Sequence, residues 1–304
     1  MVLDEYFSLL GNSCVPSFLD KYLNCPSILR LKNVGCFCGM DYASKDVYDF
    51  GEYVSRFDHS LFVALITWRF TKDKNATLAA LFHDISTPCF SHVIDYMNKD
   101  YEMQESTEEK TFDVLSSDKD LLKCLNEDGV LLSLVSDFKK YSIVDLDRPM
   151  FCADRVDGVI LNGLFWTKSI TFSDAKKIIL DLDVFFNELG ALEIGFKSLD
   201  VANFVVNTSS LIDEFCHMNS DNYMMELLAK ITRRAIDIGL ISYDDLFVLD
   251  EIELFDLLKN SSDKVILTDL DLFMNVSVSD IPLTDMPKIK KRDLNPLVLG
   301  SRLK

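Results

Sequence analysis

The chain has 304 residues, 48% of them hydrophobic, which is enough to bury one large core and excludes a disordered chain. Its formal net charge of −18 disfavours a nucleic-acid polymer as partner, because most of the surface would repel the phosphate backbone. The N-terminus has no basic region or cleavage site, and no apolar run approaches 18 residues. We therefore expect a cytoplasmic protein with no membrane partner.

Helical spacing of apolar residues recurs along most of the chain, whereas strand alternation is almost absent. Six segments show this spacing, and we predict helices over 59–70, 76–85, 151–166, 174–189 and roughly 197–217 and 221–239. Asp58, Asn75 and Ser173 are residue types that begin helices, Pro149 suits a first turn, and Gly190 suits a helix end. The pattern predicts an all-α fold.

We expect a metal-binding core over 1–170 and a helical C-terminal region over 171–304, within which the charge changes sign. Residues 244–285 carry eleven acidic side chains and two basic ones, whereas 288–304 carries six basic and one acidic. One interpretation is a solvated acidic face on which the basic tail docks. The other is that a basic residue of the tail folds back toward a phosphate-binding mouth, the candidates being Lys288, Lys290, Lys291 and Arg292.

A metal site is indicated by histidines and aspartates in three predicted helices. Three of the four histidines fall within residues 59–92, and we assign the fourth, His217, to a helix face. The candidate ligands are His59, His83, Asp84 and Asp154. Adjacent side chains on a helix diverge, so the pair His83-Asp84 can serve one ion only where a helix ends.

Burial of that pair after an apolar run would cost several kcal/mol unless something satisfies both groups. Two imidazoles and two carboxylates suit one divalent ion, such as Mn, Mg, Fe, Co, Ni or Zn, and leave coordination positions for water and a phosphoryl oxygen. Helical bundles build metal sites in this way.

The order and spacing of these residues resemble the HD-domain phosphohydrolase superfamily, and within it the deoxynucleoside triphosphate triphosphohydrolase branch. The resemblance covers roughly residues 28–166. It rests on the strings Arg56-Phe-Asp-His59, Ala-Leu-Phe-His83-Asp84, Phe90-Ser-His92-Val-Ile-Asp95 and Asp154-Arg155-Val-Asp157. The resemblance implies an HD-domain helical bundle, with the remaining residues as a mostly helical C-terminal extension.

The resemblance also implies roles for residues around the ion. His59, His83, Asp84 and Asp154 correspond to the metal ligands of the family. Arg56 and Arg155 correspond to residues that contact substrate phosphate or sugar, a task that suits the planar guanidinium fork. His92 and Asp95 correspond to residues that orient the site.

Two positions depart from the pattern of that branch. Thr87 stands where a histidine that acts on the leaving group is expected, and Gln104 stands where a second histidine is expected. Glutamine cannot transfer a proton near neutral pH, so Glu105 or Glu108 would have to act as acid or base.

The leading hypothesis is a metal-dependent phosphohydrolase acting on a nucleotide or a similar small phosphorylated metabolite through metal-activated water. The alternative is a nucleotide-binding protein that has lost hydrolytic activity, as the residues at Thr87 and Gln104 would allow. A two-iron oxygenase of the same fold needs more histidines than His92 between the HD pair and the last aspartate. We also expect the chain to form a homo-oligomer, as members of the family do.

Overall fold

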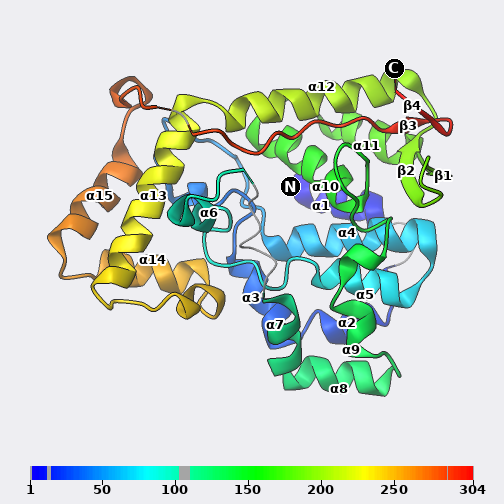
Figure 1. Ribbon diagram of the computed structural model, residues 1–304, viewed down its shortest axis with the longest axis horizontal. Coiled ribbons are helices and arrows are strands. Elements are labelled where there is room, and N and C mark those ends of the chain that lie inside the picture. Colours follow the sequence, from blue (N-terminus) through cyan, green and yellow to red (C-terminus); the bar gives the residue numbers. More distant parts are fainter. Residues whose placement is uncertain (1, 12–14, 103–109, 286, 304) are drawn as a thin grey trace.

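The computed structural model describes residues 2–11, 15–102, 110–285 and 287–303. Helices make up most of these residues and surround a buried hydrophobic cluster that extends from Tyr6 to Leu294 (Figure 1). The cluster includes residues on both sides of position 170, so the two regions share one core. The division at 170 into two units stays a prediction.

The first group of helices surrounds α4. Its members are α1 (Val2–Gly11), α2 (Leu19–Tyr22), α3 (Pro26–Arg30), α4 (Arg56–Thr71), α5 (Lys74–Phe82), α6 (Val93–Asn98), α7 (Thr111–Ser117), α8 (Lys119–Glu127), α9 (Leu132–Val135) and α10 (Ala153–Leu161). Helix α4 contacts α1, α5 and α10. Every residue from His59 to Thr67 is buried, as expected of a helix that is covered on all sides.

The helix starts differ from the predicted ones by a few residues. Ser55, not Asp58, is the N-cap of α4, and Asp58 closes a capping box by accepting from the Ser55 backbone N–H at 3.0 Å. Asp73, not Asn75, caps α5 by accepting from the Asn75 N–H at 2.7 Å. In each case the predicted cap lies in the first turn of the helix, and the true cap is a polar residue that comes two or three positions earlier.

The segment after Pro149 also begins its helix later than predicted. Helix α10 starts at Ala153 with Cys152 as its N-cap, so Pro149 precedes the helix and is not in its first turn. The predicted helix continues beyond Leu161 as a π-helical turn, Asn162–Trp166. Asp154 therefore lies in the first turn of α10, where a carboxylate is favourable.

The second group of helices follows residue 170. Its members are α11 (Phe172–Asp181), α12 (Leu199–Cys216), α13 (Asn219–Asp237), α14 (Glu251–Lys259) and α15 (Lys264–Asn275). Helix α13 contacts α6 and α15, and α12 contacts α10 and α11, so this group packs directly on the first. Helices α12 and α13 confirm the two long predicted helices.

A small sheet corrects the all-α prediction. The predicted helix 174–189 is wrong beyond Asp181, because β1 (Leu182–Phe186) pairs antiparallel with β2 (Leu192–Phe196). Gly190 lies in the hairpin turn at φ +75°, a conformation that favours glycine. Thr171, not Ser173, caps α11. Val184, Phe185 and Phe186 in β1 are residue types that favour a strand. The spacing of apolar residues alone did not distinguish this strand from a continuation of the helix.

The C-terminal tail completes this sheet. Strand β3 (Leu297–Val298) pairs parallel with β2, and β4 (Ser301–Arg302) pairs antiparallel with β3. Figure 1 shows the tail running alongside α12 before it reaches the sheet. Asp213 of α12 accepts from the Arg292 N–H at 2.9 Å, and Ser209 donates to the Arg292 carbonyl at 3.1 Å. The tail thus lies on α12, not on the acidic segment 244–285.

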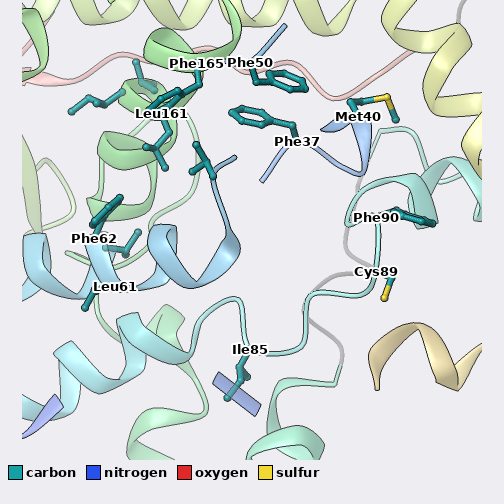
Figure 2. Packing of buried hydrophobic residues seen from close by; sticks show 14 of the residues in the cluster. Phe37, Met40, Phe50, Leu61, Phe62, Ile85, Cys89, Phe90, Leu161 and Phe165 are labelled. Carbon is teal, nitrogen blue, oxygen red and sulfur yellow. The ribbon is translucent and has the colours of Figure 1, made fainter. Parts of the chain in front are cut away.

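A loop between residues 34 and 55 leads into α4 and lies beside the core. Arg56 N–H donates to the Val34 carbonyl at 2.7 Å, and Cys36 N–H donates to the Val54 carbonyl at 2.9 Å, which closes the loop at its base. Inside it the rings of Phe37 and Phe50 stack with centroids 4.1 Å apart (Figure 2). This closure fixes the loop against the first turn of α4.

Short turns of 3₁₀ helix connect the other elements: η1 (Leu31–Asn33), η2 (Met40–Tyr42), η3 (Phe138–Lys140), η5 (Asp244–Phe247) and η6 (Val278–Asp280). Among the described helices, none has the length and apolar character needed to cross a bilayer.

The tail is held by a buried carboxylate, and this predicts a stability effect. Glu193 is fully buried, and its carboxylate accepts from Arg302, with Nη2 and Oε2 2.8 Å apart. Replacing Arg302 with alanine would leave that charge without its partner and lower the free energy of unfolding by about 3 kcal/mol. The exposed Glu188, which also pairs with Arg302, gives the control: Glu188→Ala should have a much smaller effect, because water screens this exposed pair. Urea unfolding measures both, and equal effects would contradict this account.

Candidate metal centre

Three segments of the chain bring two histidines and two aspartates to one buried point. His59 lies in α4, His83 and Asp84 follow the last residue of α5, and Asp154 lies in α10. The Nε2 atoms of the two histidines are 3.3 Å apart, and Asp154 Oδ1 lies 3.1 and 3.7 Å from them. Asp84 Oδ2 lies 3.8 and 3.7 Å from the same nitrogens. All four predicted ligands therefore converge, and the HD pair does follow a helix end.

The other nitrogen of each imidazole fixes its tautomer. His59 Nδ1 lies 2.6 Å from Oδ2 of Asp157, and His83 Nδ1 lies 2.7 Å from the carbonyl oxygen of Ala80. Because a carboxylate and a carbonyl can only accept, both Nδ1 atoms carry the hydrogen. In the neutral rings both Nε2 atoms then present bare lone pairs to each other, which is the arrangement of histidine metal ligands.

The charges at this point favour a cation. Burial disfavours a charged imidazole, yet the hydrogen bonds to Asp154 and Asp157 outweigh it and raise the pKa of His59 to about 10. Burial also opposes charge on His83, and Asp84 and Asp154 still raise its pKa. Two protonated imidazoles at this distance would repel each other. A single divalent ion would satisfy both lone pairs and the carboxylates, so the residues present fit a metal.

Asp157 and Tyr6 form a buried support for His59. Asp157 is fully buried, and it accepts from the Tyr6 hydroxyl at 2.8 Å as well as from His59. Burial raises the pKa of this carboxyl, while both hydrogen bonds favour its charged form. Asp157 belongs to the motif Asp154-Arg155-Val-Asp157, but the sequence alone gave this residue no role. Its spacing, three residues after Asp154 on one helix face, was the available signal.

Arg56 pairs with one of the four candidate ligands. Its Nη1 donates to Asp84 Oδ2 at 2.7 Å. Burial would raise the pKa of Asp84, but Arg56 and then the two histidines outweigh it and hold the pKa far below the usual range. The buried Nε of Arg56 has no hydrogen-bond partner among the described residues, and the side chain borders a cavity. Arg56 thus connects the metal cluster to that cavity.

The cavity next to the cluster has a volume of about 240 Å³ and is rich in basic groups. His59 and Asp154 form part of its wall. The basic side chains that line it are Arg56, Arg148, Arg155, Lys290 and Arg292. A cavity with five basic side chains inside a chain of net charge −18 is a local site for an anion.

Two of these basic residues come from the C-terminal tail. Lys290 and Arg292 are two of the four tail residues predicted to reach a phosphate-binding mouth, and they do line the cavity. Lys288 instead pairs with Glu102 at 2.8 Å on the surface. The alternation of side chains along the extended tail explains why Lys290 and Arg292 share one face.

Arg148 was missed by sequence analysis. Burial and the neighbouring Arg155 and Arg292 lower the pKa of its guanidinium to about 10, while Asp154 raises it. An anion bound among these three arginines would relieve their repulsion. Its position before Pro149 in a segment without periodicity gave no sign of this role.

Arg155 is held by neighbouring chain atoms while it lines the cavity. Its Nη2 lies 3.2 Å from Asp145 Oδ1, and its Nη1 donates to the carbonyl of Met150 at 3.1 Å. Asp145, Cys152 and Asp154 also have the spacing of a metal site. Arg155 already supplies positive charge there, and burial raises the pKa of the Cys152 thiol to about 12. Among the described residues we therefore keep the group around His59, His83 and Asp154 as the candidate metal centre.

His92 and Asp95 form a pair at the cavity wall. His92 lines the cavity, and its Nδ1 lies 2.8 Å from Oδ2 of the fully buried Asp95. Because the carboxylate accepts from Nδ1, the Nε2 of His92 is the nitrogen that remains for a ligand. The two residues predicted to orient the site are thus in contact.

The remaining predicted residues lie elsewhere. Thr87 is fully buried and is not among the residues that line the cavity, so this side chain does not replace the expected histidine. Gln104, Glu105 and Glu108 lie outside the described residues. His217 is the C-cap residue of α12, outside the cavity lining, which agrees with its assignment to a helix face.

Comparisons with known proteins agree with this geometry. Residues 56–141 match the model of the HD domain family. The match begins at Arg56 and includes His59, His83 and Asp84. It supports the resemblance of this region to metal-dependent phosphohydrolases. A protein of Bacillus subtilis strain 168, the uncharacterized protein YdhJ, is 26% identical over 253 residues, which cover 81% of this chain and 74% of that protein.

The support of His59 by Asp157 yields a test of the metal centre. Asp157→Asn keeps all four ligands but removes the charge behind His59, and we expect about 10- to 100-fold weaker metal binding. Competition for Co²⁺ or Zn²⁺ against a chelator measures the affinity. Tyr6→Phe is the control, because it keeps the carboxylate and should weaken binding less. Unchanged affinity in Asp157→Asn would contradict the assignment.

Proposed function

We propose that the chain is a metal-dependent phosphohydrolase that acts on a nucleotide. The observation that carries the proposal is the position of two imidazole nitrogens 3.3 Å apart, with Asp154 and Asp84 around them, beside a cavity lined by five basic side chains. The first feature suits a divalent ion and the second suits phosphate groups. The match to the HD domain over residues 56–141 supports the same reaction class.

His59, His83, Asp84 and Asp154 would hold the ion. When bound, a divalent ion supplies Lewis acidity, which activates water as a nucleophile and withdraws electron density from a phosphoryl oxygen. Arg56 and Arg155 would bind the phosphoryl oxygens and neutralise charge that develops as the phosphorus–oxygen bond breaks. Their positions are held in advance by Asp84 and Asp145.

His92 would give a proton to the leaving oxygen. Asp95 accepts from its Nδ1, which leaves Nε2 as the donor atom that faces a ligand. This assignment supplies an acid although Thr87 and Gln104 replace the expected histidines. Glu105 remains a second candidate for acid or base from the sequence alone.

The substrate class follows from the two kinds of side chain in the cavity. Basic residues favour a phosphorylated ligand, and the aromatic residues Phe37, Phe50, Tyr48 and Trp166 favour a planar group attached to it. A deoxynucleoside triphosphate is our first candidate, because the motifs resemble that branch. We propose a small phosphorylated partner in preference to a nucleic-acid polymer, and we retain the homo-oligomer as a proposal.

A binding protein without turnover is the second candidate. It is favoured by the burial of Thr87 away from the cavity, which leaves the expected leaving-group histidine without a substitute at that position. Ligand would then raise the melting temperature without any product being formed.

The activity itself is tested by a panel of nucleotides with Mn²⁺, Mg²⁺, Fe²⁺, Co²⁺ or Ni²⁺. We expect phosphate, pyrophosphate or triphosphate release from at least one nucleotide, and complete loss of it in Asp84→Ala, because that change removes a metal ligand and the partner of Arg56. Asp128→Ala is the control, since Asp128 is also held by basic residues but lies outside the cavity lining. A panel without turnover for every metal would favour the binding protein.

The role of His92 gives a separate prediction. His92→Asn should lower kcat by about 10²- to 10⁴-fold, the usual contribution of a positioned acid, while metal content stays at the wild-type level. His217→Asn, at the C-cap of α12, should keep full activity. The assignment fails if His92→Asn raises only KM, or if substrates with a very acidic leaving group lose as much rate as the others.

A further inference from the structure

The cavity beside the metal cluster is also lined by an acidic residue from another helix, Asp221. Asp221 lies in α13, and it shares the lining with His59 and Asp154 of the metal cluster. Arg292, which also lines the cavity, lowers the pKa of Asp221. Because Asp221, the basic side chains and the metal cluster all border one cavity, a single bound ligand can contact side chains of all three kinds.

Asp221 has unused capacity to accept hydrogen bonds. Tyr48 donates to its Oδ1 at 2.7 Å, and among the described residues Tyr48 is the one hydrogen-bond donor to this carboxylate. Burial raises the pKa of Asp221 to about 7, and the hydrogen bond from Tyr48 and the charge of Arg292 offset this only in part. A carboxylate has about four acceptor sites. Donors from a ligand would stabilise its charged form.

The residues around Asp221 favour a planar ligand. Tyr48 stacks on Phe50 with centroids 5.5 Å apart, so this ring extends the stacked pair of Phe37 and Phe50 to three aromatic rings. All three line the cavity, as does Tyr96, whose hydroxyl donates to Asn222 beside Asp221. The ring that holds Asp221 is thus part of the wall that a flat ligand would contact.

We propose that Asp221, held by Tyr48, recognises an exocyclic amino group of the nucleobase whose phosphates contact the basic side chains of the same cavity. The identification of that ligand as a nucleotide rests on the proposed function. An amino group can donate hydrogen to the carboxylate, whereas a carbonyl at the same place would set oxygen against oxygen, and a hydrogen atom there would leave the carboxylate without a donor. Asp221 would therefore discriminate between bases that carry this amino group and bases that lack it.

Nucleosides test the proposal without any phosphate chemistry. Three pairs differ in an amino group: guanosine and inosine, adenosine and inosine, and cytidine and uridine. Calorimetric titration of the full chain should show that, in at least one pair, the nucleoside with the amino group binds about tenfold more tightly, the effect of one hydrogen bond to a charged group. In Asp221→Asn the preference should fall below about threefold.

Two further variants make the result specific. Glu226 lies on the same helix, accepts a hydrogen bond from Tyr101 and does not line the cavity. Glu226→Gln should therefore keep the full preference. Tyr48→Phe removes the hydroxyl that holds Asp221 and should reduce the preference, and it carries the test if Asp221→Asn does not fold.

Three results would overturn the proposal: no binding of nucleosides, equal binding within every pair, or a preference that survives in Asp221→Asn. Because nucleosides carry no phosphate, a preference that depends on Asp221 would stand even if the nucleotide panel showed no hydrolysis. Conversely, turnover without such a preference would support the proposed function and remove only this inference.

Discussion

The structure depends on two imidazole nitrogens that face each other at short range. His59 and His83 each direct Nδ1 at an acceptor, so their Nε2 atoms lie 3.3 Å apart beside Asp154 and Asp84. Two neutral rings would set lone pair against lone pair, and two charged rings would repel each other. A cation that binds both nitrogens and the adjoining carboxylates removes either conflict, which is why these residues fit a metal.

The helices around the metal cluster hold its side chains in place and connect the cluster to the cavity. Helices α4 and α10 and the turn after α5 supply the candidate ligands, and Arg56 at the start of α4 joins Asp84 to the cavity. The C-terminal tail, fixed to α12 and to the sheet, adds Lys290 and Arg292 to the cavity lining. The cavity is therefore built from both ends of the chain, and its basic lining depends on the docked tail.

Sequence analysis predicted the parts that local spacing determines. The convergence of the candidate ligands His59, His83, Asp84 and Asp154 could be predicted because their residue types and their positions near helix termini are visible in the chain. The strand Leu182–Phe186 was missed, because its partners at 192–196 and 297–298 lie elsewhere in the sequence and pairing overrides an apolar run. Arg148 and Asp221 could not be predicted, since only tertiary packing brings them to the cavity.

The central claim is that one ion binds between both imidazoles, and X-ray absorption spectroscopy of the cobalt-loaded protein tests it most directly. The account predicts one cobalt per chain with scattering from two imidazole rings and further oxygen ligands, and with one imidazole lost in a His83→Ala variant. A spectrum that shows oxygen ligands alone, or that is unchanged in that variant, would contradict it.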